Sequence, residues 1–157
     1  MKPKAYLETT VVSYLTARTS RDLIVAAHQK LTRGWWGRRR NRFDLYCSQL
    51  VIREAAAGDK RAAGRRLEVL EPLALLEITD QARQLARGLV TEASIPRKAA
   101  EDALHIALAT VHGMDYLLTW NCRHIANAEI RKVVTEVCTA HGYEPPVICT
   151  PEELMGD

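Results

Sequence analysis

Residues 5–15 read AYLETTVVSYL, and this stretch decides the fold class. Residues 5–7 are apolar or aromatic, as in a short buried strand, and residues 10–17 have the apolar spacing of a helix. Glu8 lies between the two predicted elements. A short strand that leads directly into a helix is the repeating unit of a parallel sheet covered by helices. The stretch therefore predicts an α/β fold in which Glu8 follows the first strand.

Short apolar runs and longer amphipathic segments keep alternating along the rest of the chain. Further strands are predicted at residues 43–47, 73–78, 115–120 and, as a possible fifth, 147–149. Helices are predicted from Ser20 onward and at residues 48–57, 59–70, 80–93, 97–112 and 123–141, with a short one after Thr150. No internal repeat, low-complexity linker or composition break indicates a second domain. We therefore expect one domain over residues 1–157.

The composition is that of an ordinary globular protein, with 47% hydrophobic and 26% charged residues. No apolar run approaches the roughly 18–20 residues that cross a bilayer, and the beginning, MKPKAYLETT, lacks the apolar stretch of a signal peptide. We expect a cytoplasmic protein that does not bind membranes. The four cysteines form no CxxC pair, which favours reduced, mostly buried thiols. Cys122 and His124 lie two residues apart, but no second pair completes a zinc site.

Positive charge gathers in one stretch, although the net charge is only +3. Residues 33–42 contain five arginines beside two adjacent tryptophans. Basic side chains interleaved with aromatic ones suit a phosphate backbone and unstacked bases. Two interpretations stay open. One is a nucleic-acid contact through Arg38, Arg39 and Arg40, and the other is a solvated and partly mobile helix end or loop.

Acidic and polar side chains follow the predicted strands. Glu8 follows the first strand, Glu54 lies in the helix after the second, and Asp102 lies one turn into the helix at 97–112. Asn121 ends the fourth strand. Ligands of open α/β sheets bind at the carboxyl ends of the strands. We therefore expect these side chains to converge there.

Buried carboxylates need a partner, because an unpaired buried charge is costly. Asp102 lies on a helix that is apolar around most of its circumference, and Glu8 leaves a strand expected to be buried on both faces. Carboxylate oxygens suit Mg²⁺ or Mn²⁺, which can activate water for phosphodiester hydrolysis. Taken singly, Glu8 could instead cap a helix, and Asp102 could interact with the helix dipole. Glu54 could pair with Arg53 or Arg61.

Histidines offer a weaker indication of the site. His105 lies three residues after Asp102, where it could reach a metal or phosphate or form only a local hydrogen bond. Other catalytic motifs are missing from the sequence: it contains no G-x-S-x-G, no G-x-x-x-x-G-K and no G-x-G-x-x-G. A serine nucleophile and a phosphate-binding loop therefore have no support.

In their order and spacing these segments resemble the PIN domain, a nuclease fold, and within it the toxins of VapC-type toxin–antitoxin pairs. The resemblance covers nearly the whole chain: residues 6–15, Glu54, EDALHIA at 101–107, and DYLLTWNCRHIAN at 115–127. It implies a three-layer α/β/α sandwich with a central, mostly parallel sheet of four to five strands. It also implies a Mg²⁺- or Mn²⁺-dependent ribonuclease, often a homodimer, that a cognate antitoxin silences.

Carried over by position, Glu8, Glu54 and Asp102 would be metal ligands. Asn121 would take the place of a fourth catalytic acid. Two departures from the family pattern bear on activity. The first acid is usually aspartate, so Glu8 is longer by one methylene, and Asn121 brings no charge, which makes a second metal less secure.

Thr10 and Thr119 would be supporting neighbours of the acids under the same resemblance. Our leading interpretation is an endoribonuclease that hydrolyses RNA phosphodiester bonds, the toxin of a type II toxin–antitoxin pair. Its possible RNA contacts are Arg38, Arg39, Arg40 and Arg53. The alternative is a catalytically impaired PIN-like protein that acts by binding RNA or a partner protein.

Overall fold

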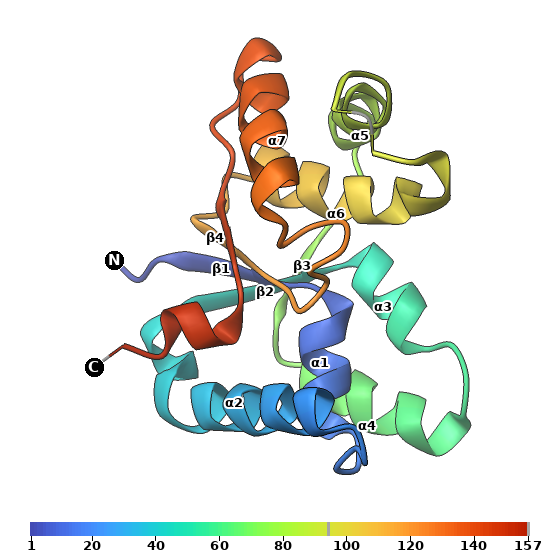
Figure 1. The fold of residues 1–157 in the computed structure, drawn as a ribbon, viewed down its shortest axis with the longest axis vertical. Helices are drawn as coiled ribbons and strands as arrows, with labels where there is room; N and C mark the ends of the chain where they lie inside the picture. Colours follow the sequence, from blue (N-terminus) through green and yellow to red (C-terminus); the bar gives the residue numbers. More distant parts are fainter. Residues whose placement is uncertain (94, 157) are drawn as a thin grey trace.

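A five-stranded sheet forms the centre of the computed structural model, which describes residues 1–93 and 95–156 (Figure 1). The strands are β1 (Lys4–Leu7), β2 (Asp44–Ser48), β3 (Ala74–Leu76), β4 (Tyr116–Leu118) and β5 (Val147–Cys149). Their order is β3-β2-β1-β4-β5, and each neighbouring pair is parallel. The predicted α/β class and parallel sheet are confirmed.

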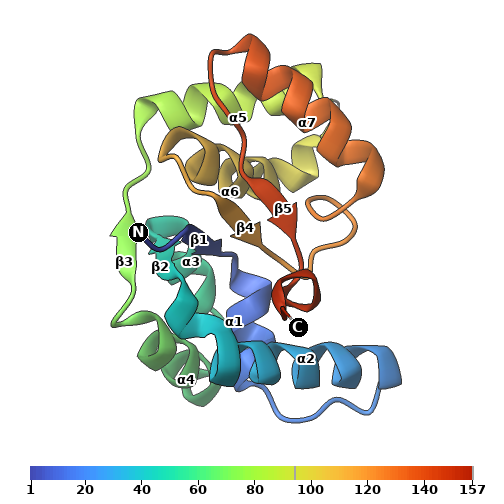
Figure 2. The same cartoon turned by 90° about the vertical axis from the view of Figure 1, so that its left-hand side faces the viewer.

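Helices cover both faces of this sheet. They are α1 (Thr9–Thr16), α2 (Leu23–Arg39), α3 (Gln49–Ala55), α4 (Lys60–Leu70), α5 (Asp80–Glu92), α6 (Ala100–Val111) and α7 (Ala128–Ala140). Short 3-10 helices are η1 (Arg40–Arg42), η2 (Arg97–Ala99) and η3 (Pro151–Leu154). Helices α5, α6 and α7 lie on one side of the sheet, and α1, α2 and α4 lie on the other (Figures 1 and 2). This is the predicted three-layer sandwich.

The central position of β1 follows from its side chains. Ala5 and Leu7 point into one apolar cluster and Tyr6 into the other, because successive residues of a strand face opposite sides. All three are fully buried. A strand covered on both faces continues directly into Glu8, as the sequence predicted.

Side-chain caps set several helix starts. Ser48 caps α3, because its side chain accepts a hydrogen bond from the backbone N–H of Val51 at 3.2 Å. The last long helix was predicted to begin at Arg123, which is wrong. It begins at Ala128, because the Asn127 side chain caps it and the preceding residues form turns.

The basic stretch is helical over most of its length. Helix α2 continues through Arg39, and Trp35 in its middle is fully buried, so of the basic stretch only η1 lies between this helix and β2. No helix within the described ranges is long and apolar enough to cross a bilayer. None of the four cysteines is in a disulfide; three are buried, and only Cys122 is exposed.

Candidate metal site

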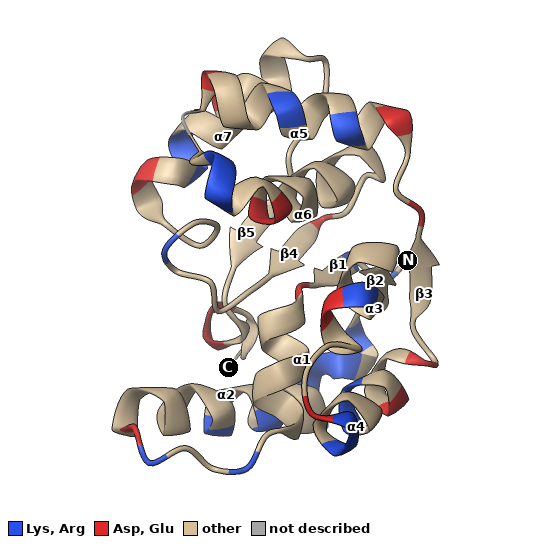
Figure 3. Cartoon of the chain, turned by 90° about the vertical axis from the view of Figure 1, so that its right-hand side faces the viewer, with Lys and Arg blue, Asp and Glu red and all other residues tan. Residues whose placement is uncertain are grey.

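The order in which the chain adds strands to the sheet changes direction at β1. It proceeds from β1 to β2 and β3, then returns to place β4 on the other side of β1. The crevice at the carboxyl ends of β1 and β4 is therefore the switch point at which α/β proteins bind ligands. Figure 3 shows this end of the molecule, with α1, α3 and α6 around it.

Glu8 lies at this switch point and is only 4% exposed. It occupies the residue before α1, but its side chain makes no capping hydrogen bond to that helix. Its Oε1 instead accepts hydrogen bonds from Thr10 Oγ1 at 2.5 Å and Thr119 Oγ1 at 2.6 Å. The structure thus argues against the helix-cap interpretation of Glu8.

Two backbone amides orient the threonine hydroxyls. Thr10 Oγ1 accepts from the N–H of Trp120, and Thr119 Oγ1 accepts from the N–H of Asn121, both at 2.9 Å. A backbone N–H can only donate, so each hydroxyl has its own proton to give to Glu8. Within the described part of the chain, Oε2 of Glu8 receives no hydrogen bond, which leaves it for another ligand.

Glu54, which belongs to the neighbouring helix α3, is also held through one carboxylate oxygen. Its Oε1 accepts from Thr9 Oγ1 at 2.5 Å and lies 2.7 Å from His105 Nε2. Arg53 pairs with Glu101 at 3.4 Å. Among the described side chains the only ion-pair partner of Glu54 is His105, so the alternative in which Glu54 pairs with Arg53 or Arg61 is wrong.

A buried chain of hydrogen bonds continues behind His105, which is 1% exposed. The Tyr6 hydroxyl lies 2.7 Å from His105 Nδ1 and 2.9 Å from Ser48 Oγ. Burial raises the pKa of Tyr6 well above its usual value, and the charges of Glu8 and Glu54 add to that rise. Tyr6 is therefore a neutral phenol at physiological pH.

Two of the predicted acids converge closely. One ligand atom each from Glu8, Glu54 and His105 lies within 4.8 Å of the others, a spacing that could hold a metal ion. Asp102 is not part of this tight group in the described structure. It lies half-buried in the first turn of α6, within the electrostatic reach of Glu54 and His105.

The pKa values of the two helix carboxyls shift in opposite directions. Burial disfavours ionisation of Glu54, but the hydrogen bond and charge of His105, with the Thr9 hydroxyl and the neighbouring Glu101, outweigh burial and lower its pKa. Burial raises the pKa of Asp102. The charges of His105 and His124 and hydrogen bonding by Asn121 only partly offset that rise.

The remaining predicted residues lie at different distances from this site. Asn121 follows β4 beside the acids, and its Oδ1 accepts from the backbone N–H of His124 at 3.0 Å. Arg53 lies exposed on α3, next to Glu54 in sequence. Cys122 and His124 belong to no group of potential metal ligands among the residues described.

The three predicted arginines of α2 and η1 lie elsewhere. They are Arg38, Arg39 and Arg40, at the carboxyl end of α2 and the start of η1, which leads into the amino end of β2. Glu54 follows the other end of the same strand. In Figure 1, α2 ends at the left of the view, whereas α3 lies at the right. Each guanidinium donates to a backbone carbonyl, of Gly34, Leu154 and Trp36 respectively.

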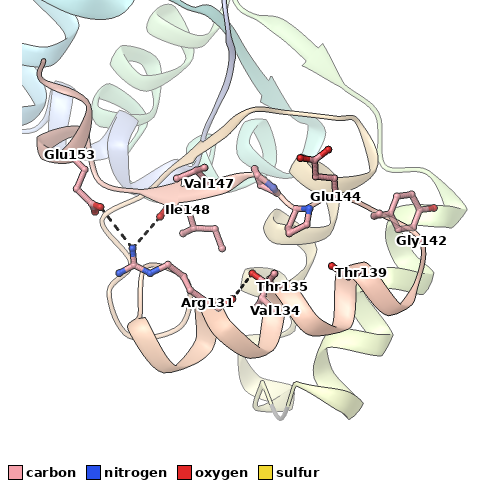
Figure 4. A pocket seen from close by; sticks show the side chains of 12 residues that line it. Arg131, Val134, Thr135, Thr139, Gly142, Glu144, Val147, Ile148 and Glu153 are labelled. Carbon is pink, nitrogen blue, oxygen red and sulfur yellow. Dashed lines mark hydrogen bonds and ion pairs between the residues drawn. The ribbon is translucent and has the colours of Figure 1, made fainter.

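A groove of about 750 Å³ lies between α7, the loop that follows it and β5 (Figure 4). Arg131 closes one end through hydrogen bonding to the Ile148 carbonyl at 3.2 Å and contact with Glu153 at 3.9 Å. None of the acids at the switch point lines it. The groove is therefore separate from the candidate metal site.

Sequence reasoning missed part of the site. The hydroxyl of Thr9 was not singled out, and neither Tyr6 nor Ser48 was connected with the acids. One signal was present: Tyr6 places a hydroxyl in the middle of a buried strand, where it must find a partner. His105 was considered, but the sequence could not show that its imidazole joins that hydroxyl to Glu54.

Comparisons with known proteins agree with this architecture. The PIN-domain family model matches residues 5–129. No curated protein matches the sequence significantly. Among solved structures, Mycobacterium tuberculosis VapC20, described as a sarcin–ricin-loop-cleaving toxin, superposes with a TM-score of 0.61 at 12% identity, covering 91% of this chain and 100% of that chain.

A second solved structure is similar over nearly its whole length. It is VapBC2 from Rickettsia felis, bound to a DNA fragment from its promoter, with a TM-score of 0.59 at 13% identity. The match covers 93% of this chain and 97% of that chain. At such low identity these likenesses show a shared fold. Since the family model spans most of the sequence, the chain belongs to the PIN-domain family.

Proposed function

We propose that this PIN domain is a metal-dependent endoribonuclease that hydrolyses RNA phosphodiester bonds. One observation carries the proposal. Glu8 and Glu54 are each held through Oε1 by two protein donors, and within the described structure no protein group donates a hydrogen bond to the other oxygen of either carboxylate. Two neighbouring carboxylates at a ligand-binding switch point repel each other, and a bound cation would offset that repulsion.

The donor set fits Mg²⁺ or Mn²⁺, which prefer oxygen ligands and keep several waters. Oε2 of Glu8, Oε2 of Glu54 and the carboxylate of Asp102 would hold the ion. When bound, it would activate a water and stabilise negative charge on the phosphate. Asn121 supports this arrangement, because its amide favours the ionised form of Asp102 and lowers the pKa of that carboxyl.

The chain also supplies positive charge at the rim of the site. The Arg53 guanidinium is exposed on α3 beside Glu54, and its contact with Glu101 is 3.4 Å long between two exposed side chains. A surface pair of this kind contributes little stability. RNA phosphate can therefore compete for Arg53 and be drawn towards the acids.

The proposal extends to a toxin that a cognate antitoxin silences, in a cytoplasmic homodimer. VapC20 is itself described as a sarcin–ricin-loop-cleaving toxin, and VapBC2 has a similar fold, which supports this extension. The competing function is a PIN domain that binds RNA or a partner without cleaving. The observation in its favour is Asn121, which stands uncharged where the family pattern has a fourth acid.

RNA cleavage by the purified chain separates the two functions. We expect cleavage with Mn²⁺ or Mg²⁺, none with a chelator, and a loss of about 100-fold or more in Asp102→Asn, since even residues that only support a metal ligand matter by about 10–100-fold. Asp80→Asn is the matched control, because Asp80 also lies in the first turn of a helix but is exposed. Undiminished cleavage in folded Asp102→Asn would contradict the proposal, and RNA binding without cleavage by the wild-type chain would support the competing function.

A further inference from the structure

The buried hydrogen-bond chain behind Glu54 holds one side of the His105 ring. The Tyr6 hydroxyl lies 2.7 Å from His105 Nδ1 and 2.9 Å from Ser48 Oγ. Ser48 is itself fixed, because its Oγ accepts from the backbone N–H of Val51. Nδ1 of His105 is therefore engaged by Tyr6.

The second imidazole nitrogen faces a carboxylate. His105 Nε2 lies 2.7 Å from Oε1 of Glu54, and an ionised carboxylate offers only lone pairs. A contact at this distance is a hydrogen bond from Nε2 to the carboxylate, so Glu54 occupies the one in-plane direction of Nε2.

These contacts favour one of two roles for His105. The spacing of His105, Glu8 and Glu54 would by itself allow the imidazole to be a third metal ligand. Both ring nitrogens already have protein partners, however: Nδ1 lies against Tyr6 and Nε2 against Glu54. Ligation of a metal through Nε2 would break the contact with Glu54.

We propose that His105 is a positioning residue that fixes the Glu54 carboxylate with Oε2 towards the divalent cation, and that it does not ligate the cation. The inference rests on the metal site proposed above. Thr9 from α1 and His105 from α6 reach the same oxygen, so Glu54 is held from two elements. Removing the donor from α6 leaves the carboxylate held from one side only.

Two substitutions at residue 105 test this role. In His105→Gln the amide nitrogen reaches the place of Nε2 and can still donate to Glu54. In His105→Asn the shorter side chain reaches only towards Tyr6. We expect the Mn²⁺ affinity to fall about 10–100-fold in His105→Asn and by less than about threefold in His105→Gln, in keeping with the cost of losing a hydrogen bond to a metal ligand.

The readouts are calorimetric titration with Mn²⁺ and pulsed electron paramagnetic resonance of the bound ion. The second reports directly whether a nitrogen coordinates the metal, and we expect that none does. His141→Gln is the matched control. His141 Nε2 makes the same kind of contact with Glu92, at 2.8 Å, on the surface between α7 and α5.

Each result supports or overturns the inference. Equal Mn²⁺ affinity in the wild type and His105→Asn overturns it while leaving the metal site intact, as does a coordinated nitrogen that disappears in His105→Gln. A wild-type chain that binds no Mn²⁺ overturns the proposed function and this inference together. If His105→Asn does not fold, Tyr6→Phe removes only the hydroxyl, and an unchanged affinity there also contradicts the inference.

Discussion

Glu54 and Asp102 extend from two helices towards one switch point, yet the protein treats the two carboxyls differently. His105 and Thr9 stabilise Glu54 as an anion, and its pKa is lowered. Burial outweighs the groups that favour ionisation of Asp102, and its pKa is raised. The protein itself thus favours the anion of Glu54, whereas ionisation of Asp102 carries a cost that a bound cation would offset. Metal binding should be coupled to stability chiefly through Asp102.

The largest expected effect is the stabilisation that Mn²⁺ provides. A ligand at about 100 times its dissociation constant stabilises the folded state by about 2.7 kcal/mol, or about 5–10 °C in Tm for a chain of this size. We expect that increase in the wild type and its loss in Asp102→Asn, measured by differential scanning calorimetry. An equal increase in both would show that Asp102 is not involved in binding.

Without metal, neutralising the two acids should change stability in opposite directions. Glu54→Gln loses charge-assisted hydrogen bonds that contribute about 1.5–3 kcal/mol, so its Tm should fall by several degrees. Asp102→Asn removes a disfavoured buried charge, and its Tm should rise by about 1–3 °C, which corresponds to less than about 1 kcal/mol. A lower Tm in both variants would contradict the comparison.

Acid should abolish both differences. The stabilisation from Glu54, whose folded-state pKa is lowered, is present above the unfolded glutamate pKa and is lost as pH falls through the folded pKa. The penalty from Asp102, whose folded-state pKa is raised, is absent at low pH and develops as pH rises through that pKa. We therefore expect the Tm of each variant to match that of the wild type near about pH 3. As the pH rises to about 7, the Tm of Glu54→Gln should fall below that of the wild type, and the Tm of Asp102→Asn should rise above it.

The smallest effect concerns the basic side chains at the two ends of β2. Arg53→Ala should reduce the slope of log affinity against log salt by about 0.7, the value for one lost contact to single-stranded RNA. Arg38, Arg39 and Arg40 lie at the other end of a five-residue strand, about 16 Å away. Their joint replacement by alanine should change the slope for long RNA but not for an oligonucleotide that spans only the acids. Fluorescence anisotropy with both lengths checks this.

Most of the fold could be predicted from the sequence because its signals are local. Apolar runs separated by capped amphipathic helices define a parallel sheet, and residues such as Ser48 and Pro151 mark helix starts. The bounds were less accurate for the last long helix. Its predicted start was Arg123, but the Asn127 side chain accepts hydrogen bonds from two later backbone amides and sets the start there.

The site was predicted less completely, since its organisation depends on contacts between distant segments. The order of strands brings Glu8 and Thr119 together across 111 positions of sequence, and Thr9 meets Glu54 across 45. Residue type alone suggested which acids to consider. It could not show that one oxygen of each glutamate is held, or that His105 links Glu54 to the hydroxyl of Tyr6.

The most direct test of the metal site is a crystal structure of the protein with Mn²⁺, located by anomalous scattering. We predict one ion bound through Oε2 of Glu8 and Oε2 of Glu54, at about 2.1–2.2 Å, with Asp102 in or beside its shell. Oε1 of both glutamates should keep its threonine donors. An ion ligated by His105 Nε2, or no ion at the switch point under conditions in which the protein cleaves RNA, would contradict the account.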